Sequence, residues 1–346
     1  AYCLARGQYT QPAFTFGIIS DVQWADVEDG TNFSGTVRRC FRGALGVLSD
    51  AVAWWSEETE LAFVANLGDL IDGRNSKLGQ SATAMEAARA LLQRLPCRVV
   101  NCIGNHELYN YDREQIDALL GTAPTPERRT YYSFSPSPGW RVLVLDSFHE
   151  SVIGWPAGHP QLRRAQATLA LNNPNDLKSG DSWFRGLEGD QKRFVPYNGA
   201  FGNDQLRWLR RELQSAAAAS ERVVVLTHAV IAPEACDGTT MTWDYAPALA
   251  ALRASGVVAA VICGHDHNGG YFLDDAGVHH LTLCSPLNLG REGRAFGAID
   301  VYEDRLELRG PRLKDLLPSR PGLATPCVRS RAAHALPDEV IQLSLR

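Results

Sequence analysis

Several sequence features that mark whole classes of protein are missing from this chain. No apolar run approaches the ~20 residues that a membrane-spanning helix needs. No basic run offers a face for nucleic acid, and 34 basic and 39 acidic residues give a net charge of −5. The eight cysteines include no C-x-x-C pair, which argues against a zinc knuckle. We therefore expect neither a nucleic acid nor a membrane as a partner.

The chain also starts without the pattern of a secretory signal, in which a charged region precedes an apolar one. Cys102, Cys263 and Cys284 lie in apolar, strand-like runs, where a free thiol behaves as a small hydrophobe. We expect reduced thiols in a cytoplasmic protein. Because the sequence does not begin with methionine, a targeting segment ahead of Ala1 is left open. The residues indicate no oligomeric state.

The chain that is present has 346 residues, of which 45% are hydrophobic and 21% charged, as is typical of a globular protein. Its first third alternates strand-like and helix-like patterns. Strands are expected over 14–20, 61–67 and 97–102, and helices over 37–55 and 82–95. This β-α-β-α-β order predicts an α/β fold with a parallel sheet and right-handed crossovers.

Further along, the pattern predicts a helix at 112–120 and a hairpin built from 131–134 and 140–146. Residues 147–200 are rich in Pro, Gly, Asn and Asp, which is typical of a lid or a substrate wall. More helices are expected at 204–218 and 244–254, and strands at 222–227, 257–263, 278–284, 295–301 and 304–309. We divide the chain into an N-terminal extension, a catalytic domain and a C-terminal tail that wraps or frays, at residues 1–13, 14–310 and 311–346.

Polar residues follow five of the expected strands at their carboxyl ends, which is where open α/β sheets place ligands. Carboxylate, amide and imidazole donors suit divalent Mn²⁺, Fe or Zn²⁺. Seven donors are too many for one ion and suit two ions about 3.5–4 Å apart. These donors are Asp21, Gln23, Asp69, Asn105, His228, His265 and His267.

The charges of these donors point to an anionic substrate. Two divalent ions bring four positive charges, and Asp21 and Asp69 cancel two of them. The two remaining positive charges suit an anionic phosphate ester or diphosphate. A carboxylate has two oxygens, so Asp69 is the natural bridging ligand between the ions. His106 stands beside a donor and is the candidate that stabilises the phosphoryl oxygens or protonates the leaving group.

Each of these motifs also occurs alone in ordinary structure. A Gly-Asp after a strand is usually only a turn, and a lone histidine such as His228 is more often a loop residue. Their joint order at strand ends is what predicts a metal centre. Five further histidines have no such context and are expected to be partly exposed or satisfied in the core: His149, His159, His279, His280 and His334.

The ordered motifs resemble the calcineurin-like metallophosphoesterase superfamily, whose signature is D-x-H, G-D, G-N-H-E, a later His and G-H-x-H. Gln23 departs from it, because the superfamily usually has His there. The fuller pattern over residues 14–310 resembles one branch, the Mn²⁺-dependent ADP-ribose/CDP-alcohol diphosphatases. Its motifs here are Asp21-Val22-Gln23, Gly68-Asp69-Leu70-Ile71-Asp72-Gly73, Gly104-Asn105-His106-Glu107 and Gly264-His265-Asp266-His267-Asn268-Gly269-Gly270-Tyr271.

This resemblance implies a four-layer αββα sandwich with two mixed β-sheets and two metals at one edge. It implies that one metal is held by Asp21, Gln23 and His267. The other is held by Asn105, His228 and His265, with Asp69 between them. Gln23 is a harder ligand than imidazole if its oxygen binds, which favours Mn²⁺ over Fe or Zn²⁺.

The resemblance further implies hydrolysis of the diphosphate linkage in ADP-ribose, CDP-choline and related nucleotides. The products are a nucleoside monophosphate and a phosphorylated sugar or alcohol. Phe33, Trp243 and Tyr245 lie in loops near the metal-bearing strand ends and could stack on a base, although loop aromatics serve packing as often. Asn110 could hydrogen-bond a phosphate or the ribose.

Two other functions stay open at this point. Cyclic-nucleotide phosphodiesterases use the same metal set, and some superfamily members are binding scaffolds with a vestigial metal site. The presence of His106 and of all seven donors favours a metal-dependent hydrolase.

Overall fold

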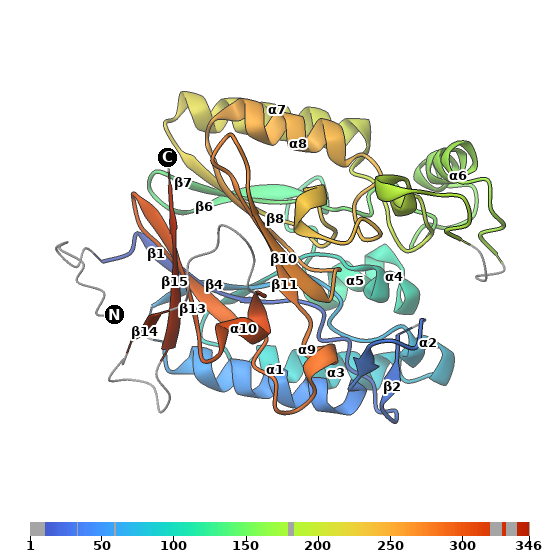
Figure 1. The fold of residues 1–346 in the computed structure, drawn as a ribbon, viewed down its shortest axis with the longest axis horizontal. Helices are drawn as coiled ribbons and strands as arrows, with labels where there is room; N and C mark the ends of the chain where they lie inside the picture. Colours follow the sequence, from blue (N-terminus) through green and yellow to red (C-terminus); the bar gives the residue numbers. More distant parts are fainter. Residues whose placement is uncertain are drawn as a thin grey trace.

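Two β-sheets lie face to face, with helices covering the outer face of each (Figure 1). The computed structural model describes residues 11–32, 34–58, 60–178, 183–318, 327–329 and 338–345. Helices α1 (Phe41–Ser56) and α3 (Ser81–Leu92) lie below one sheet, and α7 (Gly202–Ala218) and α8 (Tyr245–Ser255) lie above the other. The predicted four-layer sandwich with two mixed sheets is confirmed.

The first sheet has seven strands in the order β14-β15-β13-β12-β1-β4-β5. Strands β1, β4 and β5 are parallel, as the β-α-β-α-β pattern predicts, whereas β12 runs antiparallel to β1. The strands are β1 (Phe14–Ile19), β4 (Leu61–Asn66), β5 (Arg98–Asn101), β12 (Gly297–Val301), β13 (Arg305–Gly310), β14 (Cys327–Arg329) and β15 (Asp338–Ser344).

The second sheet has six strands in the order β10-β11-β9-β8-β7-β6. Its four central strands are parallel, and β6 and β10 are antiparallel edges. The strands are β6 (Tyr132–Ser137), β7 (Trp140–Val144), β8 (Arg222–Leu226), β9 (Val258–Cys263), β10 (Asn268–Leu273) and β11 (His279–Cys284).

The remaining elements lie in the connections between the main strands and helices. A two-stranded ribbon pairs β2 with β3, and the others are mostly short helices. These elements are β2 (Gly30–Thr31), β3 (Arg38–Arg39), α2 (Arg74–Leu78), α4 (Asn105–Asn110), α5 (Arg113–Leu120), α6 (Pro160–Asn172), η1 (Gly189–Arg193), η2 (Pro233–Ala235), α9 (Pro286–Leu289) and α10 (Leu313–Leu316).

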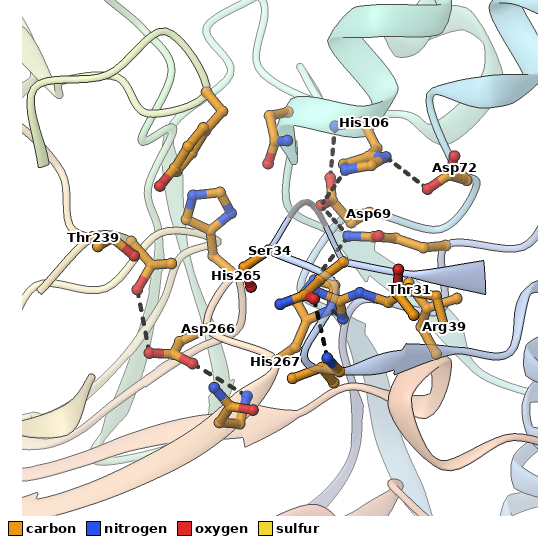
Figure 2. A pocket seen from close by; sticks show the side chains of 18 of the residues that line it. Thr31, Ser34, Arg39, Asp69, Asp72, His106, Thr239, His265, Asp266 and His267 are labelled. Carbon is orange, nitrogen blue, oxygen red and sulfur yellow. Dashed lines mark hydrogen bonds and ion pairs between the residues drawn. The ribbon is translucent and has the colours of Figure 1, made fainter. Parts of the chain in front are cut away.

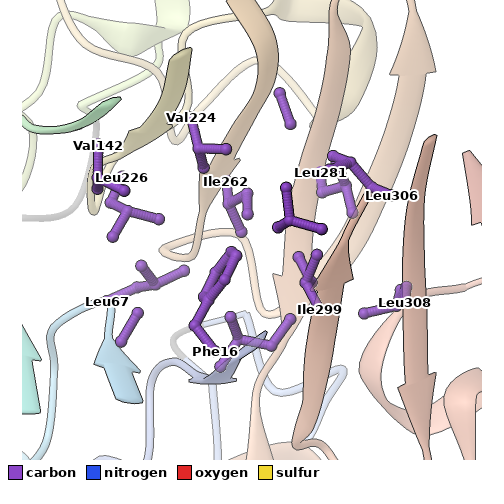
Figure 3. Packing of buried hydrophobic residues seen from close by; sticks show 14 of the residues in the cluster. Phe16, Leu67, Val142, Val224, Leu226, Ile262, Leu281, Ile299, Leu306 and Leu308 are labelled. Atoms are coloured by element: carbon purple, nitrogen blue, oxygen red, sulfur yellow. The ribbon is translucent and has the colours of Figure 1, made fainter. Parts of the chain in front are cut away.

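The main hydrophobic core lies between the two sheets (Figure 3). The Phe16 and Phe63 rings of the first sheet stack with their centroids 4.9 Å apart. They meet Leu226, Ile262 and Leu281 of the second sheet, all of them fully buried. Burying one such side chain contributes about 1.5–3 kcal/mol. This core holds the two sheets in a fixed relation, and therefore fixes the distance between the ligands that each sheet carries.

Three segments differ from the sequence-based expectation. Residues 268–273 form β10, which the pattern did not indicate, and the expected irregular segment 147–200 contains α6 and η1. Strand β15, in the expected tail, pairs with β13 along its whole length. Most of the expected N-terminal extension, residues 1–10, lies outside the described residues. The domain boundaries themselves stay a prediction.

None of the helices in the described part of the chain combines the length and the apolar character that a bilayer crossing requires.

Candidate metal centre

The predicted metal ligands lie where the carboxyl ends of strands from both sheets meet. The first sheet supplies Asp21 and Gln23 after β1, Asp69 after β4, and Asn105 at the start of α4. The second sheet supplies His228 after β8, and His265 and His267 after β9. The structure thus brings all seven predicted donors to one edge of the molecule, although they come from five strands.

The backbone at these positions is unusual. Asp21, Gln23, Asp69 and His265 all have positive φ, at 53°, 45°, 58° and 67°. Only two other non-glycine residues in the described part of the chain share this property. The left-handed conformation costs an ordinary residue about 1–3 kcal/mol, so it persists only where surrounding contacts enforce it. Its concentration here marks the strand ends as a functional site.

The donors form two groups that share Asp69. In one group, the ligand atoms of Asp69, His228 and His265 lie within 4.8 Å of one another. In the other, Gln23 Nε2 lies 2.8 Å from Asp69 Oδ2 and 2.9 Å from His267 Nε2. His267 Nε2 in turn lies 3.2 Å from Asp21 Oδ1. Asp69 Oδ2 also lies 3.4 Å from His228 Nε2, so one carboxylate oxygen faces both groups.

Two observations test whether this donor set fits cations. The Oδ1 atom of Asn105 is buried without a hydrogen-bond partner among the described residues, as a metal-ligating oxygen would be. Rotating the amide of Gln23 about its last torsion replaces Nε2 by Oε1, the better cation donor, at the same position. Both residues therefore fit a pair of divalent cations.

Hydrogen bonds indicate which nitrogen of His228 and of His265 faces the centre. His228 Nδ1 lies 2.8 Å from the carbonyl oxygen of Leu67, so it carries the proton and leaves Nε2 free. His265 Nε2 lies 2.7 Å from Asn198 Oδ1, which places that proton on Nε2 and leaves Nδ1 free. The two free nitrogens lie 3.1 Å apart and both face Asp69.

The charges of these groups depend strongly on one another. Burial would raise the pKa of Asp69, but His228 and His106 hold it below its ordinary value. Burial would lower the pKa of His228, but Asp69 and Asp21 raise it to about 10. Burial, followed by the charge of His228, lowers the pKa of His265 to about 3. A divalent cation therefore binds two ionised aspartates and competes with a proton on His228.

Glu107 holds the two strand ends of the first sheet together, a role that the sequence did not reveal. Its carboxylate accepts the backbone N–H groups of Asp69 at 2.8 Å, Leu70 at 2.6 Å and Gly104 at 2.9 Å. Gly104 is required there by close approach, since a Cβ on it would lie 2.1 Å from Asp69 Oδ1. The motif Gly104 to Glu107 thus positions the shared carboxylate of Asp69.

His106 lies beside the donors, with its ring between two carboxylates (Figure 2). Its Nδ1 lies 2.8 Å from the Gly73 nitrogen, whose N–H it accepts when the ring is neutral, and 3.3 Å from Asp72 Oδ2, to which it donates when the ring is charged. Its Nε2, 3.9 Å from Asp69 Oδ2, therefore carries a proton in either charge state. Burial would lower the pKa of His106, but Asp69 and Asp72 raise it to about 9. The ring is a proton donor at the edge of a cavity.

That cavity has a volume of about 980 Å³, large enough for a nucleotide-sized ligand. Its lining includes Gln23, Asp69, Asn105, His106, His265 and His267. In the view of Figure 2, Thr239 and Asp266 lie on the side opposite His106 and Asp72. Three arginines also line the cavity and bring positive charge to it: Arg39, Arg74 and Arg185. The sequence did not single them out, because no motif marks them.

Three of the four expected substrate-binding residues are described by the structure, and none of these three lines this cavity. Trp243 is 4% exposed and packs against Phe194 in a separate core cluster. The Tyr245 hydroxyl donates to Asp190 at 2.6 Å. Asn110 donates to the carbonyl oxygens of Asp72 and His106, and so supports the loop under His106. Phe33 lies outside the described residues. The three described residues take part in packing and support, and their contact with substrate stays a prediction.

A model of the calcineurin-like phosphoesterase family matches residues 14–269, a range that contains all seven donors and His106. The chain belongs to this family. The seven candidate donors therefore lie within the part of the chain that the phosphoesterase family shares.

Relatives within the calcineurin-like phosphoesterases cover most of the chain. A protein of Arabidopsis thaliana is 40% identical over 300 residues, 87% of this chain and 94% of the relative. A human protein is 36% identical over 321 residues, 88% of this chain and 92% of the relative. Both bear the name manganese-dependent ADP-ribose/CDP-alcohol diphosphatase.

A solved structure supports the same grouping. The crystal structure of a dimetal phosphatase from Danio rerio is 34% identical to this chain, with a TM-score of 0.83. The match covers 87% of this chain and 96% of the Danio rerio chain. A Plasmodium protein, GAP50, described as the anchor in the inner membrane complex, is 11% identical with a TM-score of 0.52. It shares the fold alone.

Proposed function

We propose that this phosphoesterase hydrolyses the diphosphate linkage of ADP-ribose, CDP-alcohols and related nucleotides. The products are a nucleoside monophosphate and a phosphorylated sugar or alcohol. The observation that carries the proposal is the sharing of Asp69 Oδ2 between two groups of donors at the edge of a cavity of about 980 Å³. The names of relatives that match nearly their whole length support the choice of substrate class.

Two divalent cations fit these donors, with Mn²⁺ the first candidate and Fe or Zn²⁺ the alternatives. When bound, such a pair supplies positive charge that neutralises the diphosphate and lowers the pKa of water. Asp21, Gln23 and His267 are the proposed ligands on one side, and Asn105, His228 and His265 on the other, with Asp69 common to both. The mixture of oxygen and nitrogen donors disfavours Mg²⁺, which prefers oxygen ligands.

His106 is the proposed general acid. Its Nε2 proton faces the cavity beside Asp69, and its own ring is held from behind by the Gly73 N–H and by Asp72. From there it can give the proton to the oxygen that leaves with the sugar or alcohol phosphate. The same N–H can stabilise a phosphoryl oxygen before the transfer.

Arg39 is the proposed contact for the phosphate groups. It lines the cavity, and its guanidinium donates to His267 Nδ1 and to Asn288 Oδ1 rather than to a carboxylate. Burial lowers the pKa of Arg39, because the desolvated cation is incompletely compensated. A substrate phosphate would compensate it, and guanidinium groups suit phosphate geometry.

The test is a hydrolysis panel with Mn²⁺, with Mg²⁺ and after removal of metal. ADP-ribose and CDP-choline should be cleaved with Mn²⁺, giving AMP with ribose 5-phosphate and CMP with phosphocholine. Turnover should fall with Mg²⁺ and vanish after chelation. AMP and CMP should be poor substrates. A clear preference for phosphomonoesters, or turnover that is independent of metal, would contradict the proposal.

The same panel separates the two alternatives. Faster turnover of a 3′,5′-cyclic nucleotide than of any diphosphate would indicate a cyclic-nucleotide phosphodiesterase. Binding of ADP-ribose without any turnover, in protein shown to contain metal, would indicate a binding scaffold.

A further inference from the structure

The segment that joins β7 to β8 contributes a row of aromatic side chains to the cavity. Trp183, Phe184 and Tyr197 all belong to its lining. The Tyr197 ring lies 5.8 Å from the ring of the proposed ligand His265, and the Trp183 ring lies 6.1 Å from that of Tyr197. Tyr197 therefore lies beside a proposed metal ligand, and Trp183 lies beside Tyr197 in the same cavity lining.

Within this row, Phe184 has the most exposed ring. It is 37% exposed and lines the cavity, a large exposure for an apolar side chain of this size. Two other aromatic side chains line the cavity. Phe41 is 1% exposed, with the Arg74 guanidinium 4.2 Å from its ring centroid. Tyr109 is also 37% exposed, but its ring packs against the proposed general acid His106, with the ring centroids 5.3 Å apart. Exposed apolar area that no such group contacts is therefore offered at Phe184, next to Trp183 in the chain.

Asparagine side chains beyond the end of α6 hold this wall in place. The carbonyl oxygen of Trp183 accepts from Asn173 at 3.0 Å and from Asn175 at 3.2 Å. Asn175 also donates to the carbonyl oxygen of Arg185 at 2.9 Å. The Trp183 indole N–H donates to Leu177 at 3.0 Å, which fixes the orientation of the ring. A wall held in this way loses little conformational freedom when a ligand packs on it.

We propose that Trp183 and Phe184 form the nucleobase wall of the cavity, against which the base of the substrate stacks. This inference rests on the proposed function, since it assigns the base end of the proposed substrate. Every nucleobase has a π-face, so stacking accepts adenine and cytosine alike. Such a wall lets one site take ADP-ribose and CDP-alcohols while rejecting diphosphates that carry no base.

The test compares two ligands that differ only by the base, AMP and ribose 5-phosphate. Calorimetry on Mn²⁺-loaded protein measures their dissociation constants without any need for turnover. Wild type should bind AMP more tightly than ribose 5-phosphate. Trp183→Ala and Phe184→Ala should each weaken AMP and CMP on the order of 5- to 100-fold, the range found for removal of a base–aromatic stack. The affinity for ribose 5-phosphate should not change.

Three further variants and readouts complete the design. Trp183→Phe keeps a flat ring and should restore most of the AMP affinity. Leu171→Ala is the matched control, because Leu171 lies on α6 in the same segment, is 85% exposed and does not line the cavity. It should leave both affinities unchanged. In steady-state kinetics, Phe184→Ala should raise KM for ADP-ribose and leave kcat nearly unchanged.

An unchanged preference for AMP in Phe184→Ala would overturn the proposal, as would a wild type that does not prefer AMP over ribose 5-phosphate. Because Phe184 is exposed, this variant decides the test even if Trp183→Ala fails to fold. If AMP binding depends on the wall but ADP-ribose is not hydrolysed, the proposed function fails and the base site stands.

Discussion

At the scale of single residues, His106 has the position that assigns it the most specific role in the reaction. Its proton on Nε2 faces the cavity, while its backbone N–H donates to Asp69 Oδ1 at 2.7 Å. The side chain and the backbone of one residue therefore serve different tasks. A substitution of the side chain removes the acid and leaves the hydrogen bond to the shared carboxylate in place.

His106→Ala should lower turnover of ADP-ribose on the order of 10²–10⁴-fold, because the leaving oxygen loses its proton donor. A nitrophenolate leaves readily without a proton, so an aryl phosphodiester should be affected little. Measuring both substrates with wild type and variant, together with metal content, tests the role. An equal loss on both substrates would assign His106 to the phosphoryl oxygens, and a loss of metal would make it a ligand.

The residue scale also shows what the sequence could predict. The convergence of the donor candidates was predictable because each follows a strand, and the carboxyl ends of parallel strands meet at one edge. Which loop side chains line the cavity was not predictable. Trp243 and Tyr245 lie between donor-bearing strands in the sequence, yet each packs against a different hydrophobic cluster. Nothing local in a sequence fixes the direction of a loop side chain, so Trp183 and Arg39 required the structure.

At the scale of elements, α5 is joined to the loop behind the metal centre by a buried ion pair. Arg113, at the start of α5, donates to Asp146 Oδ2 at 2.6 Å and to the carbonyl oxygen of Phe148. The Phe148 ring packs against His228 and His265, at 5.9 Å and 6.2 Å. The helix therefore supports two proposed ligands through one aromatic side chain.

Arg113→Met should lower the free energy of unfolding by about 3–5 kcal/mol near neutral pH, because it leaves a buried carboxylate unpaired. Burial would raise the pKa of Asp146, but Arg113 holds it below its ordinary value of 3.8. The stabilisation is thus present above that value and is lost as the pH falls through the folded pKa. In the variant, burial acts unopposed and raises the pKa of Asp146. The difference between the two proteins should therefore shrink on acidification.

Urea unfolding at pH 7, 5.5 and 4.5 measures this difference. Arg207→Met is the matched control, since Arg207 pairs with Asp204 on the exposed face of α7. Such a surface pair is worth about 0–1 kcal/mol, and its loss should be nearly neutral. If Arg113→Met and Arg207→Met lowered the free energy of unfolding equally, the assigned role of Arg113 would be excluded. The same holds if the difference in unfolding free energy between wild type and Arg113→Met widened on acidification.

The elements that the sequence did not indicate share one physical property. β1, β4 and β9 are buried runs whose composition alone predicts a strand. β10 begins with Asn268-Gly269-Gly270, and its two glycines disfavour a strand in isolation. β15 is a strand because it pairs with β13, and no local sequence pattern predicts that partner. Long-range pairing, rather than intrinsic strand propensity, therefore determines that β10 and β15 form strands.

At the scale of the whole molecule, the proposed cations connect the two sheets. Asp21 and Asp69 come from the first sheet, and His228 and His265 from the second. A cation that binds the folded chain and not the unfolded one stabilises it, by about 2.7 kcal/mol at a hundredfold excess over Kd. The metal centre should therefore contribute to global stability as well as to activity.

Dialysis against a chelator should abolish ADP-ribose hydrolysis and lower Tm, and Mn²⁺ should restore both more fully than Mg²⁺. Scanning calorimetry, with metal content measured in the same samples, records the effect on stability. Asp69→Asn provides the control, because its Tm should respond weakly to Mn²⁺. A wild-type Tm and activity that are the same before and after chelation would refute a metal-dependent centre.

The interior position of β1 in the first sheet has a consequence for how the protein is made. β1 pairs on one side with β4 and on the other with β12, at residues 297–301. Asp21 accepts the backbone N–H of His265, 244 positions later in the chain. During translation the N-terminal strands leave the ribosome long before these partners exist. The nascent chain therefore carries an unpaired strand edge until residues 297–301 have been synthesised, and the set of proposed metal ligands is complete only once His267 has been added.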